Sequence, residues 1–335
     1  MNLPLPRIAL FTLGGTIASI PTRAGGEAVP SLTADLLVKA VPQLDGLATL
    51  ETRTFCQTAS GDLTIEIIQD LAQAIADCFN DGVDGVVVTQ GTDTLEESAY
   101  LLDLLTRQEK PIVLTGAMRN AGLAGADGPA NLLAAVQVAT SKDAWGVGPL
   151  VVFADQIHLP RFVRKTHSGS IAAFTSPNAG PIGWLTEGKT RIPLRPNKRT
   201  LAFDAMTSDV YPLPRVALVK VGLGDDLEIL RDLDLRGYQG LIIEAFGGGH
   251  LPSGDVDHVS ELAARIPVLF TSRTGAGEVF TTTYGFAGSE KDLLDRGLIG
   301  AGTLDGLKAR ILLMLLLRAG ATRQQIIERF SMESM

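Results

Sequence analysis

The chain has 335 residues, of which 45% are hydrophobic and 20% charged, with a formal net charge of -8 and a mean hydropathy of +0.21. This length exceeds the size at which one hydrophobic core usually stops growing, so two domains are expected, and the apolar content excludes disorder over most of the chain. The acidic balance argues against a nucleic acid or an anionic membrane as partner and favours a small-molecule substrate.

Four short apolar runs in the first half of the chain predict buried strands. They cover residues 7–13, 85–90, 111–115 and 149–154, and glycine or small polar residues follow each of them. Longer helical patterns separate the runs, and this alternation is typical of parallel strands joined by crossover helices. The first half is therefore expected to be an α/β domain with a parallel sheet.

Helices are predicted where apolar residues recur at helical spacing between these runs. One set follows the cap candidates Asp62 and Thr64 and consists of Ile67, Ile68, Leu71, Ile75 and Phe79. Another helix is expected to begin at Thr94, because Thr94 and Glu97 have the spacing of a capping box.

The second half repeats the alternation and predicts a second, smaller α/β unit. Its apolar runs lie at residues 216–221, 241–245 and 268–271. Residues 191–214 collect four prolines and show poor apolar periodicity, so they are the predicted linker between domains at 1–190 and 215–335. The apolar stretch 311–317 is too short to cross a bilayer and predicts a buried C-terminal helix.

Cysteine and histidine usage points away from disulfides and metal. Cys56 and Cys78 are too few for a disulfide framework, and none of the four histidines has the spacing of a zinc ligand. The N-terminus lacks an apolar run with a cleavage site, and no segment reaches the ~20 apolar residues of a membrane span. We therefore expect a cytoplasmic protein with no membrane partner and no metal site.

Two predicted strands end in threonine-bearing turns. The first runs into Gly14-Gly15-Thr16, and the second into Gly91-Thr92-Asp93. Open parallel sheets bind ligands outside the carboxyl ends of their strands, so these turns are expected to share one crevice. Thr16 is a candidate nucleophile with backbone amides nearby for an oxyanion, although an ordinary turn threonine is the alternative interpretation.

A nucleophilic threonine needs partners that move protons. Asp93 supplies a carboxylate beside Thr92, and Lys165 is a candidate amine that could act against such a pair. Lys165 lies in a basic segment after the fourth strand, where a solvated loop lysine is the plainer interpretation. No Gly-x-Ser-x-Gly elbow occurs, which disfavours a serine hydrolase of the usual α/β type.

The two threonine turns resemble the signatures of bacterial-type L-asparaginases. The resemblance rests on Thr12–Ser19 and Thr89–Glu97, and it extends to residues 110–119, 174–183 and 302–304. It implies a larger flavodoxin-like, doubly wound N-terminal domain and a smaller C-terminal α/β domain. It also implies hydrolysis of asparagine to aspartate and ammonia without a metal or organic cofactor, in a homotetramer or homodimer with active sites shared between subunits.

The resemblance also assigns roles to individual residues. Thr16 would be the nucleophile that forms an acyl-enzyme, and Thr92, Asp93 and Lys165 would form a hydroxyl, carboxylate and amine relay. Ser60 would bind the substrate's α-carboxylate and Asp93 its α-amino group. The implied substrate-binding set is completed by Gly15, Gly61, Gly91, Thr92 and Glu290. Glu290 would come from the neighbouring subunit, with Glu278 as the rival for that role.

The chain departs from this family at three places. No tyrosine precedes Tyr100, and Glu27 stands where the family carries a lid tyrosine, on a glycine-bearing loop at residues 21–27 that should be a flexible lid. Glu27 is therefore a further candidate catalytic residue. Gly61 stands where a polar amide is common, and Gly247-Gly248-Gly249 replaces a segment that often offers an asparagine. Fewer side-chain contacts indicate weaker or altered substrate recognition.

Three alternatives remain open at the level of sequence. The first is an amidohydrolase for another amide, namely L-glutamine, D-asparagine or the glutaminyl group of a tRNA amidotransferase. The second is a catalytically weak amino-acid sensor. The third is a nucleotide-binding domain, which the missing Gly-x-Gly-x-x-Gly loop disfavours.

Overall fold

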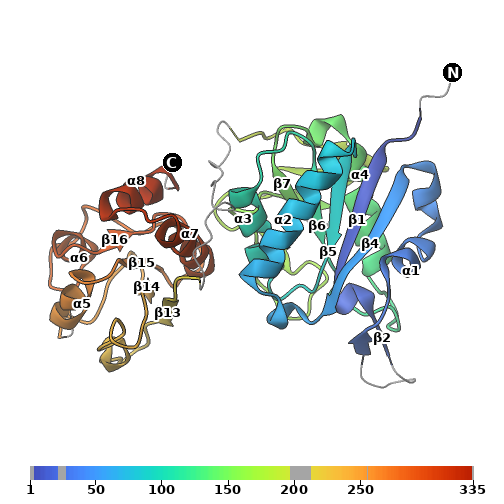
Figure 1. Ribbon diagram of the computed structural model, residues 1–335. Helices are drawn as coiled ribbons and strands as arrows, with labels where there is room; N and C mark the ends of the chain where they lie inside the picture. Colours follow the sequence, from blue (N-terminus) through green and yellow to red (C-terminus); the bar gives the residue numbers. More distant parts are fainter. Residues whose placement is uncertain (1–3, 22–27, 197–212, 255, 334–335) are drawn as a thin grey trace. The chain divides into compact units, whose positions relative to one another are not determined.

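The computed structural model describes residues 4–21, 28–196, 213–254 and 256–333, and divides the chain into two compact units, Met1–Phe203 and Asp204–Met335 (Figure 1). The division falls inside the segment predicted to be a linker. The start of that segment is attached to the first unit, because Arg195 donates hydrogen bonds to the carbonyls of Trp145 and Asp143. Residues 197–212 of the predicted linker lie outside the described part.

An eight-stranded sheet forms the centre of the first unit, with the order β12-β11-β8-β7-β6-β5-β1-β4. Its strands are β1 (Arg7–Gly14), β4 (Thr49–Thr58), β5 (Gly85–Thr89), β6 (Ile112–Thr115), β7 (Pro149–Phe153), β8 (Gln156–His158), β11 (Gly183–Thr186) and β12 (Lys189–Arg191). The five strands from β4 to β7 are parallel and follow the flavodoxin-like order 2-1-3-4-5. The order reverses between β1 and β5, so a ligand site is expected beyond the ends of these two strands.

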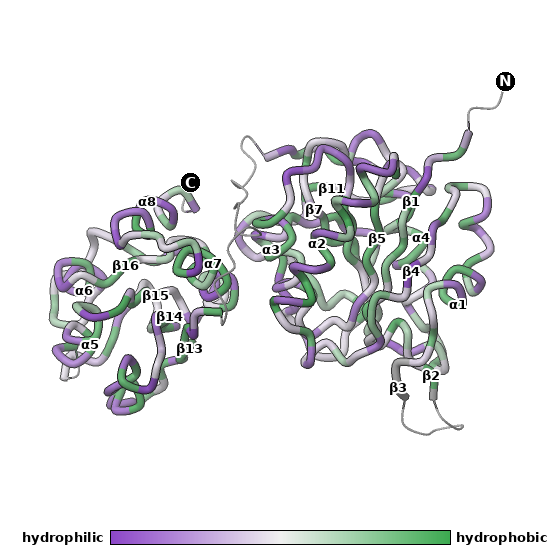
Figure 2. Tube along the Cα trace, viewed as in Figure 1, coloured by the Kyte–Doolittle hydropathy of each residue, from purple (hydrophilic) through white to green (hydrophobic). Residues whose placement is uncertain are grey.

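Helices cover both faces of this sheet, as expected for a doubly wound α/β fold (Figure 1). Helices α2 (Ile65–Asn80) and α3 (Leu95–Leu105) lie on one face, and α1 (Ala34–Lys39) and α4 (Gly128–Thr140) lie on the other. The central strands are buried on both sides, so they read as continuous apolar runs; in Figure 2 the hydrophobic colour follows β5. The predicted fold class is confirmed.

Some of the strands, helices and caps predicted from local sequence patterns are present in the structure, and others are not. The four predicted strands and α2 are present, and Thr64 caps α2 by accepting the N–H of Ile67 at 3.3 Å. The helix predicted to begin at Thr94 is confirmed as α3, with Thr94 as its N-cap residue. The predicted capping box is wrong, because the Thr94 hydroxyl donates to the Ser60 carbonyl at 2.9 Å and does not cap α3. Strand β4 was not predicted, because its residues at the edge of the sheet are half-buried or exposed and form no continuous apolar run.

The second unit is a smaller α/β unit, as predicted. Its parallel sheet has the order β13-β14-β15-β16, with bounds Val216–Lys220, Gly240–Ala245, Val268–Ser272 and Ile299–Gly300. Its helices are α5 (Val256–Ala263), α6 (Glu290–Asp295), α7 (Gly306–Arg318) and α8 (Arg323–Glu333). The predicted buried C-terminal helix is α7, whose Leu312, Leu313 and Leu315 are fully buried.

Small elements complete the described chain. A short antiparallel pair joins β2 (Ser19–Pro21) to β3 (Ala28–Pro30), and another joins β9 (Arg164–Lys165) to β10 (Phe174–Thr175). Single 3-10 turns lie at Thr16–Ala18, Pro42–Gly46, Ser60–Asp62, Lys142–Ala144 and Glu228–Leu230. None of the helices in the described ranges has the length and apolar character needed to span a bilayer.

Candidate active site

Thr16 stands on a rigid turn at the carboxyl end of β1. It begins the 3-10 turn Thr16–Ala18, whose Ile17 and Ala18 are buried while Thr16 itself is half-buried. The hydroxyl of Ser19 donates to the Gly15 carbonyl at 2.8 Å and fastens the turn. The Thr16 side chain is therefore held by a packed scaffold and remains accessible.

Two glycines let the Thr16 turn approach the Thr92 turn. A Cβ added to Gly15, whose φ is +78°, would lie 2.2 Å from the Cα of Gly91. A Cβ on Gly91 would lie 2.7 Å from Ser60 Oγ. Because no side chain fits between them, the turns that carry Thr16 and Thr92 meet backbone to backbone, and the Ser60 side chain packs against the Gly91 backbone at the same edge of the sheet.

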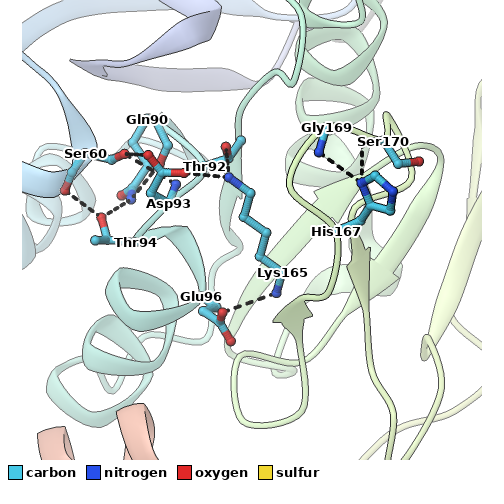
Figure 3. Close-up of polar contacts among 11 residues, drawn as sticks. Ser60, Gln90, Thr92, Asp93, Thr94, Glu96, Lys165, His167, Gly169 and Ser170 are labelled. Atoms are coloured by element: carbon cyan, nitrogen blue, oxygen red, sulfur yellow. Dashed lines mark hydrogen bonds and ion pairs between the residues drawn. The ribbon is translucent and has the colours of Figure 1, made fainter. Parts of the chain in front are cut away.

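Lys165 forms the centre of a polar group with Thr92 and Asp93 (Figure 3). Its Nζ donates to Thr92 Oγ1 at 2.8 Å and to Asp93 Oδ1 at 2.6 Å. The Lys165 side chain is only 14% exposed, whereas that of Asp93 is 75% exposed. Lys165 is thus a shielded, doubly hydrogen-bonded amine and not a solvated loop lysine, and the structure brings together three of the predicted site residues.

Asp93 is held in its charged form. The hydrogen bond from Lys165, together with its positive charge and a hydrogen bond from Ser60 at 3.3 Å, lowers the pKa of Asp93 despite the opposing effect of burial. The Ser60 hydroxyl also accepts the N–H of Asp93 at 3.3 Å. The carboxylate is therefore ionised at neutral pH, and its large exposure leaves it able to receive an ammonium group.

Ser60 and Gly61 lie together in the 3-10 turn Ser60–Asp62. Ser60 is buried, with 4% exposure, and its hydroxyl and carbonyl both contact the Thr92-Asp93-Thr94 segment. Gly61 is exposed, and a Cβ added to it would meet no atom within 4 Å. This position therefore has room for a larger side chain next to the predicted substrate-binding residues.

Gly61→Gln is expected to strengthen binding of the asparagine substrate that the family resemblance implies, without disturbing the fold, because an added amide enters open space beside Ser60. One new hydrogen bond of about 1 kcal/mol corresponds to a roughly fivefold lower KM for L-asparagine. Steady-state kinetics with unchanged thermal unfolding checks this expectation. Gly46→Gln is the control, since Gly46 has equally open surroundings elsewhere in the unit. A KM that Gly61→Gln leaves equal to that of Gly46→Gln would contradict it.

Glu290 lies in the second unit and is fully buried. Its Oε1 accepts the N–H groups of Thr283 and Tyr284 at 2.8 and 2.7 Å, and its Oε2 contacts His250 Nε2 at 3.1 Å. Burial alone would raise the pKa of Glu290, but these hydrogen bonds outweigh it and lower the pKa. Within this chain Glu290 organises the turn ahead of α6, and its role toward substrate stays a prediction. Its rival Glu278 is exposed.

The triple glycine has a local packing reason. Gly247 and Gly249 have φ values of +44° and +113°, which favour glycine. A Cβ on Gly248 would lie 2.4 Å from a ring carbon of Phe280. An asparagine at Gly248 would therefore have to displace the ring of Phe280, a residue that the sequence did not single out.

The remaining predictions concern the lid residue Glu27 and the histidines as possible metal ligands. Glu27, the candidate lid residue, lies outside the described residues. The described part of the chain contains no group of three or more His, Cys, Asp and Glu side chains placed to hold a metal ion. His167, one of the four histidines, instead accepts the N–H groups of Gly169 and Ser170 at 2.9 Å each and shapes the loop after Lys165 (Figure 3).

Sequence reasoning missed Glu96, which is 5% exposed and accepts the backbone N–H of Lys165 at 3.2 Å. The available signal was an acidic residue in the first turn of α3, directly after the Thr92 turn. That signal usually indicates only favourable interaction with the helix dipole. The partner, 69 residues away in the chain, could not be inferred from it.

His158 makes the stability of the first unit depend on pH. It is fully buried, a hydrogen bond of 2.9 Å joins its Nδ1 to Ser176 Oγ, and burial lowers its pKa from 6.5 to about 4. Between these two values the unfolded chain binds a proton that the folded chain does not. The stabilisation is thus present above pH 6.5 and is lost as the pH falls toward 4.

We expect the stability advantage of the natural chain over His158→Gln to shrink by about 2 to 3 kcal/mol between about pH 7.5 and pH 4.5. Urea unfolding of both proteins at the two pH values measures it. The other titrating groups are common to both proteins and cancel in the difference. An advantage that stays constant with pH would contradict a neutral, buried His158.

Comparison with known proteins adds a second line of evidence. The family model described as "Asparaginase, N-terminal" matches residues 7–198, and "Glutaminase/Asparaginase C-terminal domain" matches residues 215–330. A "Probable L-asparaginase" from Deinococcus radiodurans is 38% identical over 341 residues, with 99% of each chain covered. A "Probable L-asparaginase periplasmic" from Haemophilus influenzae is 35% identical, covering 93% of this chain and 89% of the relative.

A solved structure agrees with these relatives. The crystal structure of the probable cytoplasmic L-asparaginase from Campylobacter jejuni superposes with a TM-score of 0.89 at 34% identity. The match covers 97% of this chain and 99% of the other. Both halves of the chain and the overall fold therefore agree with one family, and the protein belongs to the asparaginase family.

Proposed function

We propose that the protein hydrolyses L-asparagine to L-aspartate and ammonia, with Thr16 as the nucleophile. The observation that carries the proposal is the shielded Lys165 amine, 2.8 Å from the Thr92 hydroxyl and 2.6 Å from the Asp93 carboxylate, beside the accessible Thr16 turn. Membership of the asparaginase family supports it.

The first half of the reaction transfers the acyl group to Thr16. Its Oγ adds to the side-chain amide carbon of asparagine, and the negative charge that develops on the amide oxygen needs donors. Among the described residues, the N–H groups of Thr16 and Thr92 have no hydrogen-bond acceptor, so both are available for this purpose. The carbon–nitrogen bond then breaks and leaves an ester on Thr16.

Thr92 and Lys165 handle the protons. Because the Lys165 ammonium donates to Thr92 Oγ1, the Thr92 hydrogen must point to another acceptor. We assign the role of that acceptor to the leaving nitrogen of the substrate. The nitrogen takes one proton from Thr16 and one from Thr92, which Lys165 replenishes, and departs as ammonium. Water then adds to the ester, returning one proton to Thr16 and one, through Thr92, to Lys165.

Asp93 and Ser60 are the residues that we expect to bind the amino-acid part of the substrate. The ionised, exposed Asp93 carboxylate suits the α-ammonium of an amino acid. Ser60 offers a hydroxyl for the α-carboxylate next to it. Gly15 and Gly91 contribute close backbone approach in place of side-chain contacts, whereas Gly61 leaves open space beside Ser60. This pattern favours a free amino acid as substrate.

The assembly and the compartment are also proposals. We infer a homotetramer or homodimer with active sites shared between subunits, supported by the family resemblance of Glu290. Analytical ultracentrifugation tests the oligomeric state. The two named relatives and the solved structure include a periplasmic and a cytoplasmic protein, so the expected cytoplasmic location stays a prediction.

Ammonia release by the purified protein from L-asparagine, L-glutamine and D-asparagine tests the proposed function. The proposal expects the highest kcat/KM with L-asparagine, with aspartate formed in equal amount. Preferred release from L-glutamine or D-asparagine would assign the protein to another amide. Calorimetric binding of L-asparagine without ammonia release would identify an amino-acid sensor instead.

A further inference from the structure

Lys165 lies on a strand that is too short to fix its position alone. Its strand, β9, has two residues, and its partner β10 also has two, with Lys165 opposite Phe174. Isolated two-stranded pairs are marginally stable even when they are longer. Hydrogen bonds that join Thr166 to Ala173 and Thr175 extend this support by one residue. The Lys165 amine must reach both Thr92 and Asp93 within hydrogen-bond distance, so any further contact that fixes its backbone bears directly on the site.

Glu96 supplies that connection from the other side of the site (Figure 3). Its carboxylate Oε1 accepts the backbone N–H of Lys165 at 3.2 Å, and the side chain is 5% exposed. A charged acceptor makes a stronger bond than a neutral one, and the N-terminus of a helix favours a carboxylate. The Lys165 backbone is therefore tied to the first turn of α3.

The same turn of α3 also carries the targets of the lysine. Thr92 and Asp93 directly precede α3, which begins at Leu95. One helix end thus sets the position of the hydroxyl and the carboxylate through the chain, and the position of the amine through Glu96. We propose that Glu96 is a positioning residue that holds Lys165 against Thr92 and Asp93. The inference rests on the proposed function, because it assigns Glu96 a part in that reaction.

The test compares Glu96→Ala and Glu96→Gln with the natural chain in hydrolysis of L-asparagine. Glu96→Ala is expected to lower kcat by about tenfold to a hundredfold, the usual effect of a small misplacement of a reacting group. Its KM should stay within about twofold, because Glu96 touches neither Ser60 nor the exposed side of Asp93. Glu96→Gln keeps a carbonyl acceptor of the same length and should recover most of kcat.

A labelling experiment reports on position without using activity. Acetic anhydride acylates accessible amines, and peptide mass spectrometry reads the rate at Lys165. We expect Glu96→Ala to speed acylation of Lys165 by at least about threefold, as the amine leaves its two partners. Glu66→Ala, which removes a carboxylate from the first turn of α2, is the matched control and should change neither kcat nor the Lys165 rate.

The outcomes separate this inference from the proposed function. If the natural chain hydrolyses L-asparagine and Glu96→Ala keeps both the kcat and the slow Lys165 labelling, the positioning role is wrong while the function stands. A kcat loss that Glu96→Gln fails to recover would also overturn it. If the natural chain releases no ammonia, the proposed function is wrong, and faster labelling in Glu96→Ala would still support the positional tie.

Discussion

Thr16→Ala is expected to slow ammonia release from L-asparagine by at least about a thousandfold, because removal of a nucleophile eliminates the covalent route entirely. The loss should fall on kcat, since Ser60 and Asp93, which would bind the amino acid, are untouched. Thr16→Ser keeps a hydroxyl and should retain measurable turnover. Steady-state ammonia assays on the three proteins, with aspartate binding measured by calorimetry, provide the comparison.

Two controls separate the loss of the Thr16 hydroxyl from a loss of the fold. Thr16 is half-buried on a turn that Ile17, Ala18 and Ser19 hold in place, so its truncation should leave thermal unfolding unchanged. Thr49→Ala removes a threonine from the exposed start of β4, at the amino end of the same sheet, and should keep full activity. Full turnover in Thr16→Ala would contradict the assignment of the nucleophile.

Lys165→Met is expected to lower kcat by about a hundredfold to ten-thousandfold, the range typical of a lost proton-transfer group. The side chain keeps its approximate length but loses the bonds to Thr92 and Asp93. The double variant Lys165→Met/Thr92→Val should be little worse than the poorer single variant, since residues that act as one unit are not additive. A double variant whose loss in kcat equals the product of the two single losses would contradict a relay in which Lys165 and Thr92 act together.

The same variant should also shift the pH dependence. Lys165 lowers the pKa of Asp93 in the natural chain, so its removal is expected to raise that pKa toward the ordinary value. Since Asp93 must be ionised to bind the α-ammonium of asparagine, the acid limb of the kcat/KM profile should move to higher pH. A limb that stays in place would show that Asp93 does not control it.

The sequence predicts those elements whose burial produces a regular apolar pattern. Strand β5 is buried on both faces and appears as an uninterrupted apolar run, and α2 shows helical spacing with a Thr64 cap. Edge elements gave no such pattern, so β4 was missed. Thr94 shows the limit of local rules, because a tertiary hydrogen bond to Ser60 took the place of the predicted cap.

The residues of the candidate site likewise fall into those that the sequence predicts and those that only the structure reveals. Thr16, Thr92 and Asp93 follow strand ends, so topology alone predicts that they share one edge of the sheet. Lys165 was uncertain from spacing, and the structure brings it to Thr92 through a two-residue strand. Glu96 and Phe280 act through contacts between distant segments, which neither periodicity nor motif spacing encodes.

The most direct test of an acyl-enzyme on Thr16 is product partition with hydroxylamine. Two substrates with the same acyl group and different leaving groups, L-asparagine and the β-methyl ester of L-aspartate, are hydrolysed with hydroxylamine present. An acyl-enzyme common to both predicts the same ratio of aspartyl hydroxamate to aspartate from each, at every hydroxylamine concentration. A ratio that depends on the leaving group would show direct attack by water and contradict the covalent route.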